Sequence, residues 1–159
     1  MTKTTILHAI EAELRRQLAT QAAALQSAVE GALDEQAKPE NKYDTRALEQ
    51  SYLAAGQTER VEALRQVIAD LHFYAPPEAM TAIGPGALAE VDGARLPRWV
   101  FVVPFAASMV VEVDGEQVQV VSVQAPLARS LLGKQAGDVV VAGVGAAARE
   151  VEVLSVDGR

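Results

Sequence analysis

The sequence contains no cysteine and only two histidines among its 159 residues. A chain without cysteine forms no disulfide, zinc finger or thiol nucleophile, and two histidines are too few for a multi-histidine metal site. No run approaches the roughly 18 apolar residues that a membrane span requires. The first residues also lack the continuous apolar core of a signal peptide. We therefore expect a cytoplasmic protein.

Acidic residues outnumber basic ones: the sequence has 14 lysines and arginines and 21 aspartates and glutamates, which gives a net charge of −7. This balance argues against a protein that binds nucleic acid directly through contacts to the phosphate groups. Half of the residues are apolar. That content suffices for a buried core in one domain or in two small ones.

Glycine and proline are scarce before residue 75 and frequent after it. The first part holds two of the 11 glycines and one of the seven prolines. Such residues punctuate turns and loops, so the change in composition indicates a change in architecture. We predict a helical hairpin over residues 1–74, a linker over 75–86 and a second domain over 87–159.

Two helices are predicted within residues 1–74, because apolar residues recur there at steps of three and four. The first stripe comprises Leu7, Ile10, Leu14, Leu18, Ala22, Leu25 and Val29, and the second comprises Leu48, Tyr52, Ala55, Val61, Leu64, Ile68 and Leu71. Pro39 interrupts the pattern and disfavours helix just before it. Two helices of about 30 residues joined by a short connection must return antiparallel to cover their apolar stripes.

The second domain is predicted to be mostly antiparallel β structure with one short helix, which makes the whole chain α+β. Its valine-rich strand candidates are 88–91, 99–103, 109–113, 117–123, 139–144 and 151–156. Asp114 and Gly115 form a tight hairpin signal between two of them. A helix is expected over 126–132, since Pro126 suits its first turn and Gly133 its C-terminal cap.

The net charge of the hairpin is concentrated near its turn. Residues 30–49 carry a net charge of −3, whereas residues 1–29 carry +1 and residues 50–76 carry −1. One interpretation is a solvated loop whose acidic residues suit the start of a helix. The other is a set of carboxylates held at the end of a rod, ready to meet a cation or a basic surface.

Two motifs stand out in the sequence: the turn contains Glu40-Asn41-Lys42-Tyr43, and residues 125–138 read Ala-Pro-Leu-Ala-Arg-Ser-Leu-Leu-Gly-Lys-Gln-Ala-Gly-Asp. Both motifs resemble the Gre family of bacterial transcript-cleavage factors. The resemblance implies an FKBP-like second domain that docks on RNA polymerase, and a hairpin that enters the secondary channel of the polymerase. Two tip carboxylates would there help to hold Mg²⁺ in the active centre, where backtracked RNA is hydrolysed.

Magnesium suits this role because it takes hard oxygen ligands and keeps several waters, so one or two added carboxylates recruit it. The resemblance assigns Glu40 to this task. The second family carboxylate, three residues earlier, falls on Ala37. A replacement carboxylate would come from Asp34, Glu35 or Asp44. We take Asp34 as the second metal ligand. Asp44 could instead cap the following helix together with Asn41.

The resemblance also assigns supporting residues. Those expected to position the tip are Asn41, Lys42, Tyr43 and Arg46, and those expected to dock on the polymerase are Pro126, Arg129 and Lys134. Lys42 and Arg46 could form salt bridges within the tip or contact acidic groups of the polymerase. Arg129 and Lys134 could equally be solvated residues at a helix end.

Three functions follow from these observations. The first is an auxiliary factor, not itself an enzyme, which stimulates RNA cleavage by the polymerase and binds Mg²⁺ only in its active centre. The second is a non-cleaving regulator in the same channel, which Ala37 favours. The third is a prolyl isomerase or peptide-binding module. Such isomerases line their pocket with many aromatic residues, whereas the second domain offers only Trp99, Phe101 and Phe105.

Overall fold

The computed structural model describes residues 1–33, 46–143 and 148–158. The chain forms two compact units. One comprises Ala12–Ala69, and the other joins Met1–Glu11 to Asp70–Arg159. Helices precede a mostly antiparallel sheet, so the predicted α+β class is confirmed. Within the described ranges, no helix is long and apolar enough to cross a membrane.

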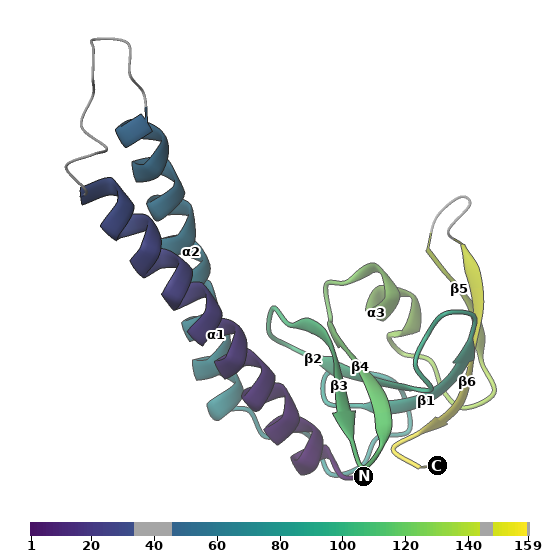
Figure 1. Cartoon of the computed structure of the whole chain (residues 1–159). Helices are drawn as coiled ribbons and strands as arrows, with labels where there is room; N and C mark the ends of the chain where they lie inside the picture. The colour runs from purple at the N-terminus through teal and green to yellow at the C-terminus, as the bar shows by residue number, and fades with distance from the viewer. Residues whose placement is uncertain (34–45, 144–147, 159) are drawn as a thin grey trace. The chain divides into compact units, whose positions relative to one another are not determined.

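The two long helices are α1 (Lys3–Leu33) and α2 (Arg46–His72). They lie side by side in the ribbon (Figure 1), and residues of both line one hollow in the unit Ala12–Ala69. Leu14 and Ala28 of α1, and Val61 and Val67 of α2, are buried in that unit. The predicted pair of helices is therefore present. The predicted stripe of α1 is wrong at Ala22 and Val29, which are exposed, and Ala28 is buried instead.

The predicted apolar stripe of α2 is wrong over its first half. Leu48 and Tyr52 are 55% and 70% exposed, and Ala55 is exposed as well. The reason is a step of six residues between Ala55 and Val61. Because each helical residue turns the chain by roughly 100°, this step displaces the apolar face by roughly 120° around the helix. The first three apolar residues consequently point away from the buried side.

Six strands form one sheet in the order β3-β4-β2-β1-β6-β5. Their bounds are Leu88–Gly93 (β1), Trp99–Val103 (β2), Ser108–Val113 (β3), Glu116–Ser122 (β4), Val139–Ala142 (β5) and Arg149–Val156 (β6). Strands β2 and β4 pair in parallel, and every other pair in the described sheet is antiparallel. Each predicted strand overlaps an observed one, because branched residues at alternating positions fit a pleated surface.

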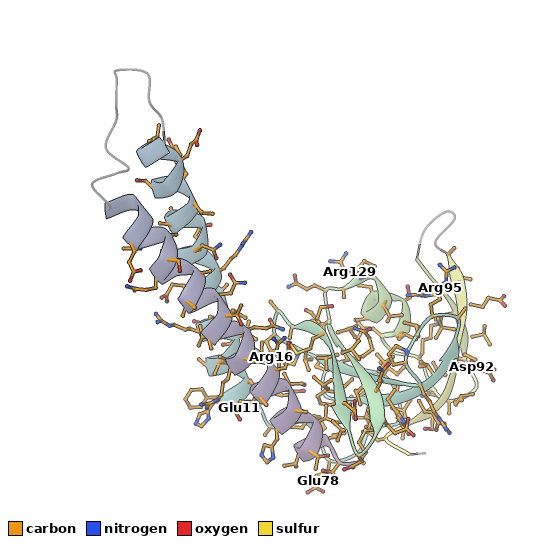
Figure 2. The ribbon with its side chains drawn as sticks, viewed as in Figure 1. Glu11, Arg16, Glu78, Asp92, Arg95 and Arg129 are labelled. Atoms are coloured by element: carbon orange, nitrogen blue, oxygen red, sulfur yellow. The ribbon has the colours of Figure 1, made fainter. Side chains whose placement is uncertain are left out.

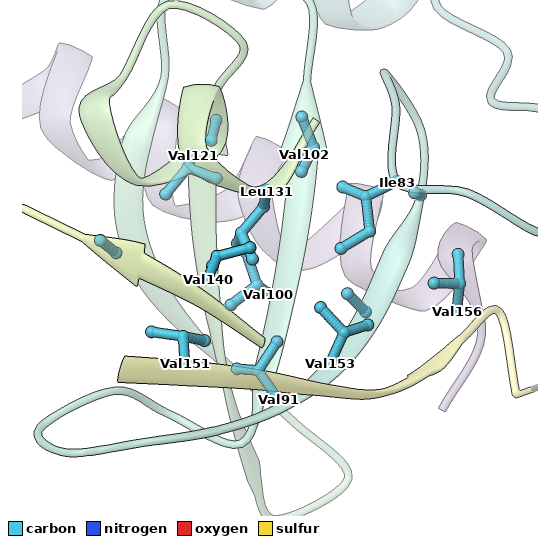
Figure 3. Packing of buried hydrophobic residues seen from close by; sticks show 14 residues of the cluster. Ile83, Val91, Val100, Val102, Val121, Leu131, Val140, Val151, Val153 and Val156 are labelled. Carbon is cyan, nitrogen blue, oxygen red and sulfur yellow. The ribbon is translucent and has the colours of Figure 1, made fainter. Parts of the chain in front are cut away.

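The short helix α3 (Pro126–Leu131) contributes Ala128 and Leu131 to the apolar core of the sheet. Figure 3 shows Leu131 close to Val100 and Val140 within this cluster. Proline occupies the first turn of α3 as predicted, and Gly133 has a φ of 78°, the left-handed conformation expected after a helix end.

The segment between α2 and β1 is hydrogen-bonded to the sheet domain. The Ile83 amide donates to the Lys134 carbonyl at 2.8 Å, and the Gly133 amide donates to the Ile83 carbonyl at 2.7 Å. The Gly86 amide donates to the Val102 carbonyl at 2.7 Å. Ile83 is itself part of the apolar cluster. This segment therefore adds to the core that positions α3 and the following turn.

A partly buried ion pair joins the start of α1 to Asp157, the residue after β6. The Lys3 ammonium lies 2.7 Å from Asp157 Oδ2, and these side chains are 14% and 3% exposed. Lys3 also donates to the Pro77 carbonyl at 2.7 Å, and Asp157 Oδ1 accepts the Leu88 amide at 2.9 Å. Each of the two charged groups thus has more than one partner, which offsets the cost of partly removing it from water.

Gly86→Ala is expected to destabilise the protein by about 3 kcal/mol. The residue has a φ of 91°, and an added Cβ would lie 2.6 Å from Tyr74 Oη and 2.7 Å from Pro77 Cδ. Gly115→Ala is the control, since its φ is 80° but no described atom lies within 4 Å of the added Cβ. It should lose only about 1 kcal/mol. Urea unfolding measures both; equal losses would exclude a packing role for Gly86.

Lys3→Met is expected to lower the free energy of unfolding by about 2 kcal/mol, because it removes the cation that hydrogen-bonds the partly buried Asp157 carboxylate. Arg65→Met is the control: the Arg65–Glu62 pair is 60% and 62% exposed, so its loss should cost less than about 0.5 kcal/mol. Adding Asp157→Asn to Lys3→Met should recover part of the loss. Equal stability of the two single variants would contradict this account.

Candidate functional site

The predicted tip residues Asp34, Glu35, Glu40, Asn41, Lys42, Tyr43 and Asp44 lie outside the residues that the structure describes. Arg46 is the first residue of α2, and only its backbone is described. The helices on either side of this tip segment (residues 34–44) end at Leu33 and begin at Arg46. Elsewhere in the chain, the described residues contain no group of three histidine or acidic side chains that could hold a metal ion.

A hollow of about 490 Å³ lies between the helices of the unit Ala12–Ala69. Its lining residues are Arg16, Gln17, Thr20, Gln21, Arg60, Ala63 and Leu64. Arg16 is engaged by Glu13, whose Oε1 lies 2.7 Å from Arg16 Nη2 and accepts Gln17 Nε2 at 2.8 Å. The hydrogen bonds from Arg16 and Gln17 lower the pKa of Glu13 to about 2. Glu13 is therefore ionised at neutral pH and holds Arg16 against the helix.

The three predicted docking residues lie on α3 and the turn that follows it. Pro126 and Arg129 are exposed, and Lys134 is half-buried. Figure 2 shows the Arg129 side chain extending from the region of α3. The Lys134 backbone is fixed, because its amide donates to the Leu131 carbonyl at 3.0 Å and its carbonyl accepts the Ile83 amide. The fold thus supplies a small surface with two cationic side chains and one proline.

Two of the three aromatic residues that were considered for a peptide pocket are buried in the sheet domain. Phe101 is fully buried and Phe105 is 6% exposed. Phe105 packs edge-on against Tyr74, with ring centroids 5.7 Å apart, and burial raises the pKa of Tyr74. Trp99 lines a groove of about 600 Å³, but neither phenylalanine does. Two of the three aromatics therefore serve the core.

Sequence reasoning missed a group of acidic residues on the sheet. Asp92, Glu150 and Glu152 line one shallow hollow together with Val139. Asp92 of β1 pairs with Glu152 of β6, and Glu152 also pairs with Val139 of β5. Only the strand register brings these carboxylates together, because Asp92 is far from the other two in sequence. The alternation of acidic residues along 150–152 was the one available signal.

Comparison with known proteins identifies the second domain. Residues 109–158 match the family described as "Transcription elongation factor, GreA/GreB, C-term". No curated protein matches the sequence. The match includes α3, β4, β5 and β6, so the similarity lies in the sheet domain. This match to the Gre family model over residues 109–158 agrees with the resemblance found in the sequence.

Similar solved structures include Gfh1, named as GreA factor homolog 1, from Thermus thermophilus. It is 20% identical, with 92% of this chain and 93% of that chain covered and a TM-score of 0.39. Gfh1 of Thermus aquaticus is 22% identical, with 91% and 92% covered and a TM-score of 0.36.

Proposed function

We propose that the protein is an auxiliary factor of RNA polymerase that stimulates the cleavage of backtracked RNA. The observation that carries this proposal is a Gre-type C-terminal domain in the same chain as two long helices whose connection is rich in acidic residues. A helix of 31 residues, such as α1, is about 45 Å long. A pair of that length is suited to carry side chains away from a docked domain and into a partner.

Each part of the chain has a separate task in this proposal. Arg129 and Lys134 contact the polymerase and fix the position of the factor, with Pro126 beside them. Glu40 and Asp34 supply carboxylate oxygens for Mg²⁺ in the polymerase active centre, with Glu35 and Asp44 as the other candidate acids. Magnesium, when bound there, stabilises the attacking and leaving oxygens of the hydrolysis. Asn41, Lys42, Tyr43 and Arg46 position the tip.

A non-cleaving regulator is the second candidate. Ala37 stands where the resemblance expects a carboxylate, so the tip segment lacks one of the two usual metal ligands. A factor of this kind would occupy the same path in the polymerase and change initiation, pausing or nucleotide entry without recruiting a metal ion.

The deciding experiment uses a backtracked elongation complex that carries 3′-labelled RNA and the cognate polymerase. Wild-type protein is expected to accelerate the release of short 3′ fragments in Mg²⁺. Glu40→Ala should reduce that acceleration by at least about tenfold, because a lost metal ligand removes more than about 1.4 kcal/mol of stabilisation. Asp34→Ala/Glu35→Ala should show a similar loss if either residue supplies the second carboxylate.

Glu59→Ala is the matched control, since Glu59 is an exposed acid of α2 outside the tip segment. It should retain wild-type stimulation. If wild-type protein binds the polymerase but releases no RNA fragment, the cleavage proposal is refuted and the non-cleaving regulator is supported.

Docking is tested separately by measuring the affinity of the protein for polymerase. Arg129→Glu combined with Lys134→Glu should weaken binding by at least about tenfold, because reversed charges would face the same partner groups. Arg95→Glu is the control, as Arg95 is another exposed arginine of the sheet domain (Figure 2). Equal affinities for wild type and the double variant would remove these residues from the interface.

A further inference from the structure

Strand β5 forms one edge of the sheet. It pairs with β6 and has no other neighbour in the order β3-β4-β2-β1-β6-β5 (Figure 1). Among the described residues, no segment besides β6 forms a backbone hydrogen bond with β5. An edge of this kind presents N–H and C=O groups with which another extended chain can pair.

The hydrogen bonds next to β5 show which of its residues offer these groups. The Val153 amide donates to the Asp138 carbonyl at 2.9 Å, so the backbone of Asp138 faces β6. In an antiparallel pair, residues that exchange hydrogen bonds alternate along a strand with residues that do not. Val140 therefore also faces β6, whereas the N–H and C=O groups of Val139 and Val141 point to the free edge.

The side chains of the same two valines are exposed. Val139 and Val141 are 59% and 61% exposed, whereas Val140 belongs to the apolar core (Figure 3). Edge strands that stay unpaired commonly carry a lysine, a proline or a bulge, and β5 consists of three valines and an alanine. This edge therefore lacks the usual protection against pairing with another strand.

Three carboxylates lie on the same face of the sheet as these valines. Glu150 and Glu152 of β6 are opposite Val141 and Val139, and Asp92 of β1 is opposite Glu152. None of the three carboxylates forms an ion pair with a residue that the structure describes. Like charges directly opposite each other destabilise a sheet, so a cation that covers this face would relieve their repulsion.

We propose that the free edge of β5 binds an extended protein segment in which basic residues alternate with apolar ones. The segment adds a strand to the sheet, and its backbone pairs with Val139 and Val141. The added strand lies about 4.8 Å from β5 and about 10 Å from β6. A lysine or arginine reaches across β5, with its carbon stem over a valine and its charged group at Glu150 or Glu152.

The alternation in the bound segment follows from the two faces of the sheet. Residues on the face of Glu150 and Glu152 need a positive charge, whereas the intervening residues point to the side of Val140 and the core, where apolar side chains are favoured. A second copy of this chain is a poorer occupant, because its β5 edge would bring further carboxylates to the same face. The edge shares no residue with the predicted docking surface or the tip segment, so this inference does not depend on the proposed function.

The test uses a fluorescent peptide of about seven residues in which lysine and valine alternate, and it measures binding to the full-length protein by fluorescence anisotropy. The control peptide has the same composition with its lysines and valines in separate blocks. Both peptides have the same charge, so long-range attraction to an acidic protein is matched. The alternating peptide is expected to bind at least about tenfold more tightly, because it alone fits both faces of the sheet.

The carboxylates are tested by Glu150→Gln combined with Glu152→Gln, which should weaken binding of the alternating peptide by at least about fivefold. Glu112→Gln combined with Glu116→Gln is the matched control. It removes the same charge from exposed positions of β3 and β4, at the other edge of the sheet. This control should bind the peptide within about twofold of wild type.

The backbone pairing is tested by Val141→Pro, which removes an N–H group at the free edge and leaves the hydrogen bonds between β5 and β6 in place. It should weaken peptide binding by at least about fivefold. Val141→Thr is the control, since it keeps the N–H group and a branched side chain, and it should bind within about threefold of wild type. Thermal unfolding followed by circular dichroism identifies any variant that is not folded.

The inference is overturned if the alternating peptide does not bind, if the block peptide binds equally well, or if the two glutamine double variants lose the same affinity. It is also overturned if the protein forms a dimer in sedimentation that Val141→Pro converts to a monomer, because a second copy would then occupy the edge.

Discussion

A partly buried ion pair between Lys3 and Asp157 holds the start of α1 against the sheet domain. Asp157 adopts a φ of 50°, its amide donates to the Leu88 carbonyl at 2.8 Å, and its carboxylate accepts both Leu88 and Lys3. Lys3 extends the network to Pro77. A buried pair is stable only where further hydrogen bonds satisfy its remaining donors and acceptors. The first turns of α1, the segment after α2 and the end of β6 consequently form one compact unit.

Much of this fold was predictable from local sequence signals. The strand positions followed from valine alternation, and α3 followed from Pro126 and Gly133, because these features act within a few residues of the chain. Contacts between distant residues were not predictable in this way. Lys3 and Asp157 are 154 positions apart. The facing of Asp92 and Glu152 requires the strand register, which residue spacing alone does not specify.

The first half of α2 shows why periodicity alone was insufficient. Leu48, Tyr52 and Ala55 repeat at helical spacing and were predicted to be core residues, but they are exposed. The pattern identified the helix correctly and misassigned the face, because the phase changes before Val61. The candidate site was likewise predictable only in part. The motif around Arg129 predicted the family of the second domain, whereas the arrangement of the tip carboxylates depends on loop conformation, which residue types do not determine.

Residues 17–29 of α1 and 50–58 of α2 carry no charge, whereas residues 30–49 between them carry a net charge of −3. Electrostatic interactions strengthen as water is excluded, so charges on these two stretches would act strongly on any partner that covered them. Cations on the helices would also neutralise the field of the tip carboxylates. A section without charges avoids both effects. Within residues 1–76 the net negative charge is thus concentrated in residues 30–49, which carry −3, whereas residues 1–29 carry +1 and residues 50–76 carry −1.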